Sequence, residues 1–196
     1  MTEVSLELLI KAAISGTAII SFPTDTVPAL ATRPDMAHLI FAAKQRQPDK
    51  PLILMGADAA DLWPYVTGTP AEFTHWQQIA QQGWPGALTL VLPASERVPG
   101  AMNPTDPTTI GLRVPDHTLA RQILRETGPL ATTSANLSGS PPLETLPEIT
   151  TQFPTVLTPD VSYWQTGSGL PSTVALWQQS RWQILRQGAV ELKFEG

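Results

Sequence analysis

The chain has 196 residues, of which 42% are hydrophobic and 15% charged, a composition typical of a globular protein long enough to bury a sizeable core. It contains no cysteine, which excludes disulfides, thiolate catalysis and sulfur-ligated metal sites. Its three histidines lie far apart and its formal net charge is −5, so we expect neither a metal site built from protein ligands alone nor phosphate-driven binding of nucleic acid.

The sequence shows neither a membrane span nor an export signal. No apolar run approaches the roughly eighteen residues that a span needs. The N-terminal segment carries Glu3 and Glu7 and lacks a basic stretch before an apolar one, so it does not resemble a signal peptide. The 20 prolines and 13 glycines are dispersed, and no repeat or composition break marks a boundary. We therefore expect a cytoplasmic protein with a single domain over residues 1–196.

Helical and strand patterns alternate along the chain. A first helix starts at Leu6 and is ended by Gly16, and a buried strand over 17–22 ends at Pro23. Further helices are expected at 35–44, 72–82, 117–127 and 144–152, and further strands at 51–55, 87–92, 108–114, 129–133, 172–177 and 182–186. This interleaving indicates an α/β fold. Because no helix separates the strands at 87–92 and 108–114, we expect a mixed sheet.

Common nucleotide and hydrolase motifs are missing. The sequence contains no GxxxxGK[ST] phosphate loop and no GxSxG nucleophile elbow. Gly167-Ser-Gly169 begins like a dinucleotide fingerprint but precedes a strand instead of following one, so we interpret it as a flexible loop. The carboxylate pair Asp58 and Asp61 is interpreted as part of an exposed turn.

Three polar segments remain as candidates for a site. Pro23-Thr-Asp-Thr-Val27 ends the first strand, where α/β sheets bind ligands, although Thr and Asp side chains in such a turn also bond their own backbone. Lys44, Arg46 and Lys50 offer cations to one anion, or simply a charged helix end. The segment 132–139 offers hydroxyl and amide groups to phosphate oxygens, or forms a plain Ser/Asn turn.

Two further arginines lie in strand-like surroundings. Arg113 is embedded in Ile-Gly-Leu-Arg-Val-Pro, and Arg186 follows Ile-Leu. A guanidinium beside buried strands needs a partner. From the residues alone, that partner is either a structural carboxylate or an anionic ligand.

Taken in order, these segments resemble the YrdC-like threonylcarbamoyl-AMP synthase family, in its short form without the extra C-terminal domain. The resemblance covers residues 17–188 and rests on seven motifs: Pro23-Thr-Asp-Thr-Val27, Lys44-Gln-Arg46, Trp84-Pro-Gly-Ala-Leu-Thr89, Thr109-Ile-Gly-Leu-Arg-Val-Pro115, Ser134-Ala-Asn-Leu-Ser-Gly139, Ser172-Thr-Val174 and Leu185-Arg-Gln-Gly188. No single motif is decisive, but their common order is highly specific.

The resemblance implies a twisted mixed sheet with packed helices around an open concave cavity. It implies ATP-dependent condensation of L-threonine and bicarbonate into threonylcarbamoyl-AMP with release of pyrophosphate, with Mg²⁺ carried in by the nucleotide. Other proteins would then transfer the product to tRNA, as the first step of threonylcarbamoyladenosine modification, and a weak contact with tRNA itself is included in this expectation.

The resemblance also assigns residues, one by one. Catalysis falls to Lys44, Arg46, Ser134 and Asn136. The ATP-binding set is Lys44, Arg46, Lys50, Thr109, Asn136 and Arg186. Threonine falls to Thr26, Arg113, Ser134 and Ser172, with Arg113 pairing the carboxylate of the amino acid.

The sequence departs from the family pattern around the implied amino-acid pocket. Pro28 and Ala29 stand where the family usually has an aromatic residue and glycine, and Met55 stands where threonine-binding members often have histidine. Gln47 replaces a common proline. Two other functions therefore stay open: a paralogue that uses the same nucleotide pocket on another acceptor, and a non-catalytic RNA-binding module associated with translation, which the acidic net charge disfavours.

Overall fold

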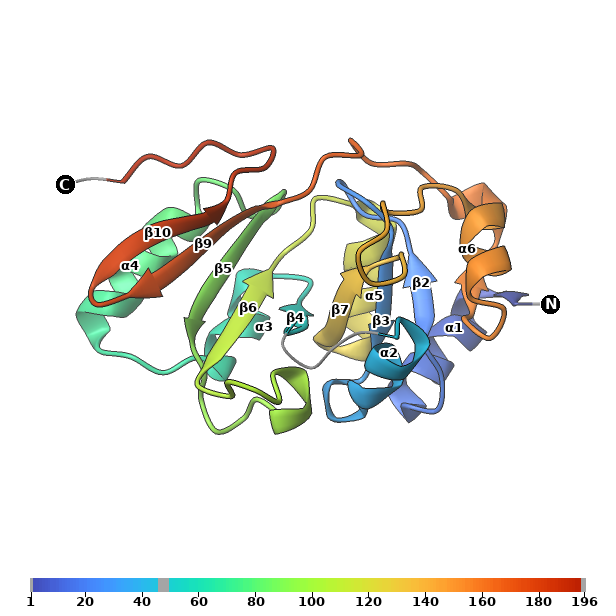
Figure 1. The fold of residues 1–196 in the computed structure, drawn as a ribbon, viewed down its shortest axis with the longest axis horizontal. Helices are drawn as coiled ribbons and strands as arrows, with labels where there is room; N and C mark the ends of the chain where they lie inside the picture. Colours follow the sequence, from blue (N-terminus) through green and yellow to red (C-terminus); the bar gives the residue numbers. More distant parts are fainter. Residues whose placement is uncertain (1, 46–49, 195–196) are drawn as a thin grey trace.

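The computed structural model describes residues 2–45 and 50–194, and within them the fold is built around an eight-stranded sheet (Figure 1). Its strand order is β10-β9-β5-β6-β4-β7-β3-β2. The strands are β2 (Ile20–Phe22), β3 (Ala29–Thr32), β4 (Ile53–Met55), β5 (Leu88–Pro93), β6 (Thr109–Arg113), β7 (Leu130–Ser134), β9 (Thr173–Gln178) and β10 (Arg181–Arg186). Two short strands, β1 (Glu3–Val4) and β8 (Thr158–Pro159), pair separately in parallel.

The sheet is mixed, as the sequence predicts. Strands β5 and β6 pair antiparallel, in agreement with the absence of a helix between them. Parallel pairs join β4 to β6 and β5 to β9. The neighbours β4–β7, β7–β3, β3–β2 and β9–β10 are antiparallel.

Apart from α3, which was not predicted, the helices in the described part of the chain lie close to the predicted ranges. They are α1 (Leu6–Ser15), α2 (His38–Ala43), α3 (Ala59–Leu62), α4 (Pro70–Ala80), α5 (Thr118–Thr127) and α6 (Leu146–Gln152). Helix α4 begins two residues before its predicted start because Thr69 caps it, accepting the Glu72 amide hydrogen, while Pro70 occupies the first turn. The exposed Asp58 and Asp61 do more than form a turn: the Asp58 amide donates to Asp61 at 2.9 Å at the start of α3.

Strand β3 was not predicted, and the strand before it is shorter than expected. The segment Ala29–Thr32 follows Pro28 and has only one β-branched residue, so its local strand signal is weak. In the fold it pairs antiparallel with both β2 and β7 and is buried along its length. Its strand conformation therefore depends on its two neighbours.

The buried hydrophobic residues form two clusters. Helices α1 and α5 pack together, and their residues Leu9, Ile10, Ile123 and Leu124 join one core with Phe22 of β2. The second core contains Trp76 and Ile79 of α4 with Leu88, Leu90 and Leu112. Figure 1 shows α4 at the β9–β10 end of the sheet and α1 at the β2 end.

The tryptophans are dispersed in the sequence but meet in the structure. Ring contacts link Trp84 to Trp63, Trp63 to Phe73 and Phe73 to Trp76. They continue from Trp76 through Trp177 to Trp182. Trp76 and Trp177 belong to the second core, and Trp63, Trp84 and Trp182 pack against it. In the described part of the chain, no helix has the length and apolar character to cross a membrane.

Candidate functional site

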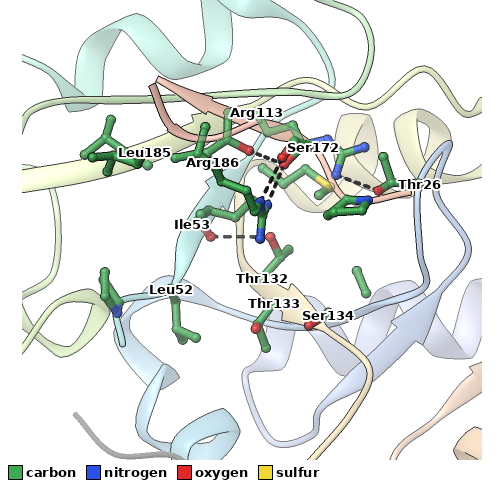
Figure 2. Close-up of a pocket in the computed structure, with 18 of the residues that line it drawn as sticks. Thr26, Leu52, Ile53, Arg113, Thr132, Thr133, Ser134, Ser172, Leu185 and Arg186 are labelled. Atoms are coloured by element: carbon green, nitrogen blue, oxygen red, sulfur yellow. Dashed lines mark hydrogen bonds between the residues drawn. The ribbon is translucent and has the colours of Figure 1, made fainter. Parts of the chain in front are cut away.

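A cavity of about 640 Å³ lies across one face of the sheet (Figure 2). Alternate residues of β4, β5 and β6 line it, as expected for side chains that share one face of a pleated sheet. These residues are Ile53 and Met55 of β4, Thr89 and Val91 of β5, and Thr109, Gly111 and Arg113 of β6. Strand β7 adds the consecutive residues Thr132, Thr133 and Ser134, and β9 adds Val174, Leu176, Trp177 and Gln178. The turn after β2 adds Thr24 and Thr26. Residues from distant parts of the chain therefore share one open concavity, which confirms the expected fold class.

Arg113 is held rigidly at the end of β6. Its side chain is 6% exposed, and its guanidinium donates to Asp25 Oδ1 at 2.7 Å and to Thr26 Oγ1 at 2.8 Å. Its Nε donates to the Gly86 carbonyl oxygen at 3.1 Å. Burial lowers the pKa of Arg113, and the charge of Asp25 opposes that effect. The partner left open by the sequence is thus the structural carboxylate of Asp25.

The turn at Thr24–Thr26 has a defined direction of hydrogen bonding. Thr24 Oγ1 donates to the Val27 carbonyl oxygen at 2.7 Å, so the 3.1 Å contact between the two threonine hydroxyls requires Thr26 to donate to Thr24. Thr26 Oγ1 in turn accepts from Arg113. Thr24 therefore satisfies its own turn, and Thr26 lines the cavity beside the guanidinium.

Gly86, the glycine of the Trp-Pro-Gly motif, supplies the carbonyl oxygen that accepts from Arg113 Nε. Gly86 follows the cis Trp84–Pro85 peptide and has a φ of 153°, a conformation that favours glycine. A Cβ at this position would lie 2.8 Å from the Gly83 carbonyl oxygen. The Gly86 amide donates to Val114 at 2.8 Å, which fixes the carbonyl that accepts from Arg113.

A second cation lines the cavity at the C-terminal end of β10. Arg186 Nε donates to the Ser172 carbonyl oxygen at 3.0 Å, and its Nη2 donates to Ser172 Oγ at 3.2 Å (Figure 2). The Ser172 hydroxyl also meets Thr89 Oγ1 at 2.9 Å. Partial burial lowers the pKa of Arg186. For Arg186 the described partners are neutral groups, in contrast to the carboxylate beside Arg113.

Lys44 lies beneath the loop that follows β7 and is fully buried. Its Nζ donates to the Ser134 carbonyl oxygen and, at 2.9 Å, to Asn136 Oδ1. Ser134 Oγ donates to the same Asn136 oxygen at 2.6 Å. Of these three residues only Ser134 lines the cavity. The ammonium of Lys44 therefore does not face the cavity and orders the loop through its hydrogen bonds to Ser134 and Asn136.

The remaining predicted residues are dispersed around this arrangement. Thr109 lines the cavity beside the buried Asn103, and Lys50 is exposed next to Pro51, which also lines the cavity. Arg46 and Gln47 lie outside the described residues. Thr89, Asn103 and Asp106 also line the cavity, although the sequence patterns assigned them no role in the site. The period-two alternation of β5 and β6 was the signal that could have pointed to the lining threonine of β5.

The departures from the family pattern converge on the same cavity. Pro28, Ala29 and Met55 all line it. Met55 is paired in register with Arg113 on the neighbouring parallel strand, so the two side chains project from the same face. The altered positions therefore surround the end of the cavity that contains Arg113. No group of three or more His, Cys, Asp or Glu residues suited to a metal ion occurs within residues 2–45 and 50–194.

Comparisons with known proteins agree with this architecture. The Sua5_yciO_yrdC family model, described as "Telomere recombination", matches residues 12–188. The chain is 35% identical over 179 residues to a threonylcarbamoyl-AMP synthase of Bacillus subtilis, covering 88% of this chain and 50% of that protein. It is 33% identical over 188 residues to one of Vibrio campbellii, covering 94% and 99% respectively. The chain thus spans about half of the Bacillus relative but nearly all of the Vibrio one.

Solved structures show the same likeness. Sua5 of P. abyssi complexed with L-threonine has 31% identity and a TM-score of 0.82, with 92% of this chain and 54% of that chain covered. YciO of E. coli has a TM-score of 0.78 at 23% identity, with 94% and 91% covered, a likeness of fold. On the family match and these relatives, the chain belongs to the Sua5/YciO/YrdC family.

Proposed function

We propose that this protein is an enzyme that makes threonylcarbamoyl-AMP from L-threonine, bicarbonate and ATP and releases pyrophosphate. The observation that carries the proposal is the convergence of two guanidinium groups, from Arg113 and Arg186, on one hydroxyl-lined cavity. The names of the Bacillus and Vibrio relatives, and the L-threonine in the P. abyssi complex, support this reaction for the present chain.

At the amino-acid end, Arg113 is the proposed carboxylate partner. A guanidinium offers five N–H donors, and three of those of Arg113 go to Asp25, Thr26 and Gly86. Donors beyond these three can meet a carboxylate that enters the cavity, in the planar geometry that arginine favours. The hydroxyls of Thr26, Ser134 and Ser172 are proposed to orient the rest of the amino acid.

At the nucleotide end, positive charge and amide groups are proposed to hold ATP. Arg186 and Thr109 line the cavity, and the exposed Lys50 directly precedes Pro51, which also lines it. Asn136, ordered by Lys44, is proposed to meet phosphate oxygens or the Mg²⁺ that accompanies them, together with Arg46. Catalysis at a phosphoryl centre rests mainly on positioning and charge stabilisation, which suits a site without a protein nucleophile.

The proposed reaction balances in two steps. The amine of threonine attacks bicarbonate, water leaves and a carbamate forms. A carbamate oxygen then attacks the α-phosphorus of ATP, the bond to the β-phosphate oxygen breaks, and pyrophosphate departs. The product is an activated acyl-adenylate, which other proteins are proposed to transfer to tRNA.

The direct test is turnover by the purified protein. With ATP, Mg²⁺, bicarbonate and L-threonine, we expect threonine-dependent pyrophosphate release and an adenylate of matching mass. Replacing Arg113 by alanine should abolish this product, whereas replacing Arg125, an exposed arginine of α5, should not. Tight ATP binding without a threonine-dependent product would refute the proposal.

One observation favours a second candidate, a paralogue that carboxylates and adenylates another amine. Pro28, Ala29 and Met55 line the end of the cavity that contains Arg113, where they replace the usual family residues. An amino-acid panel in the same turnover assay separates the two candidates, because the paralogue would release pyrophosphate with an amine other than threonine. The non-catalytic RNA-binding alternative would instead show salt-sensitive tRNA binding without pyrophosphate release.

A further inference from the structure

The Gly167-Ser-Gly169 segment, interpreted from the sequence as a flexible loop, is docked on the backbone of the Thr24–Thr26 turn, and the threonines of that turn line the cavity. It belongs to residues 165–171, here called the strap, which connect the region of α6 to β9. Figure 1 shows this orange-red segment running across the top of the molecule. The strap ends at Pro171, which lines the cavity and precedes Ser172, the residue that binds Arg186.

Two backbone hydrogen bonds fasten the strap to the turn after β2. The Ser168 amide donates to the Asp25 carbonyl oxygen at 2.9 Å, and the Gly169 amide donates to the Thr26 carbonyl oxygen at 3.0 Å. The side chains of these same two acceptor residues hold the guanidinium of Arg113. The strap therefore fixes the backbone from which the arginine is oriented.

Gly167 allows this close approach. A Cβ at Gly167 would lie 2.4 Å from the Thr24 carbonyl oxygen and 2.5 Å from backbone atoms of Asp25 and Thr26. Ordinary van der Waals contact begins at 3.4 Å, so any larger residue has to move the strap and the turn apart by about 1 Å. Because the obstructing atoms are backbone, no side-chain rotation can relieve the overlap.

The strap also joins both ends of the cavity. Beyond Gly169, the Pro171 carbonyl accepts the Ala189 amide at 3.2 Å, and Ser172 accepts two hydrogen bonds from Arg186. A shift of the strap at Gly167 acts first on the turn that contains Asp25 and Thr26. The hydrogen bonds of Pro171 to Ala189 and of Ser172 to Arg186 do not involve this turn, so we expect them to be retained.

We propose that the strap positions the amino-acid end of the cavity and that Gly167 is the positioning residue, acting through the Asp25–Thr26 backbone on Arg113. For the identity of the substrate this inference rests on the proposed function. It predicts that a perturbation at Gly167 weakens use of the amino acid much more than use of ATP. A displacement of about 1 Å at a positioning contact is worth up to about a hundredfold in rate.

The test compares Gly167→Ala with Gly100→Ala, a matched control because a Cβ at Gly100 meets nothing within 4 Å. In Gly167→Ala we expect the KM for L-threonine to rise by about ten- to a hundredfold while the KM for ATP stays within about twofold. Ser168→Pro, which removes one fastening amide at an exposed residue, should change the same KM in the same direction by a smaller factor. This second variant keeps the test decisive if Gly167→Ala does not fold.

A second readout needs no turnover. Hydrogen exchange at the amides of Ser168 and Gly169, and the NMR signals of the Arg113 guanidinium, should change in Gly167→Ala and remain as in the wild type in Gly100→Ala. Unchanged signals and an unchanged KM would overturn the proposal, and so would an equal loss for both substrates together with a lower melting temperature. If the wild type does not use threonine, the proposed function fails, and the exchange and NMR comparison alone decides whether the strap positions Arg113.

Discussion

Replacing Asp25 by alanine tests whether its ion pair with Arg113 organises the site. Asp25 Oδ1 accepts from Arg113 at 2.7 Å and from the Asp116 amide at 3.1 Å. The side chains of the pair are 15% and 6% exposed, so solvent screens them little. Removing the carboxylate leaves a buried guanidinium without its charged partner.

The expected loss of stability follows from that geometry. Truncating one partner of a buried ion pair lowers the free energy of unfolding by about 3–5 kcal/mol. Asp25→Asn retains an oxygen acceptor and loses only the charge, so its effect should be smaller. Asp35→Ala is the control, because its ion pair with Arg33 is exposed and should contribute little.

Urea denaturation of the three variants at pH 7, followed by tryptophan fluorescence, measures these differences. Threonine turnover should fall in Asp25→Ala more than in Asp25→Asn, because Arg113 is less constrained. Equal unfolding free energies for Asp25→Ala and Asp35→Ala would refute the reasoning.

Three further predictions concern Lys44, Met55 and His117. Lys44→Ala should lower the unfolding free energy by about 2–4 kcal/mol, because the Ser134 and Asn136 oxygens lose a buried donor. Lys11→Ala is the control, because the ion pair of Lys11 with Glu7 is exposed and should contribute little. Equal melting curves for the two variants would contradict the loop-ordering role of Lys44. Met55→His, beside Arg113, should change the KM for threonine by about three- to tenfold and leave the KM for ATP unchanged. A change confined to the KM for ATP would contradict the assignment of the Arg113 end of the cavity to the amino acid. Burial lowers the pKa of His117 from its ordinary 6.5. The unfolded chain therefore binds a proton more readily at this histidine than the folded protein does. The contribution of His117 to stability is present above pH 6.5 and is lost as the pH falls from 6.5 toward the folded pKa. NMR titration of the imidazole should give a midpoint below 6.5, and a midpoint above it would contradict the burial argument.

Local signals were sufficient for the elements that carry their own caps and periodicity. Gly16 ends α1 as predicted, and its amide bonds the Ala13 carbonyl oxygen. Helix α5 and strands β5 and β6 lie within a residue or two of their predicted ranges. The order of the seven motifs also identified the family, which the family match over residues 12–188 confirms. These features depend on a few neighbouring residues, so the sequence can reveal them.

The placement of the site residues depended on contacts between distant segments. Arg113 and Asp25 are 88 positions apart, and Lys44 and Asn136 are 92 apart. Nothing local distinguishes a cation that lines a cavity from one buried beneath a loop, so the position of Lys44 could not be predicted. Strand β3 and the docking of Gly167 likewise exist only because neighbouring backbones lie against them. The sequence by itself determined which residue types are present and which elements they favour. The tertiary structure alone decided which of them share the cavity, because burial and long-range hydrogen bonding are properties of the assembled sheet.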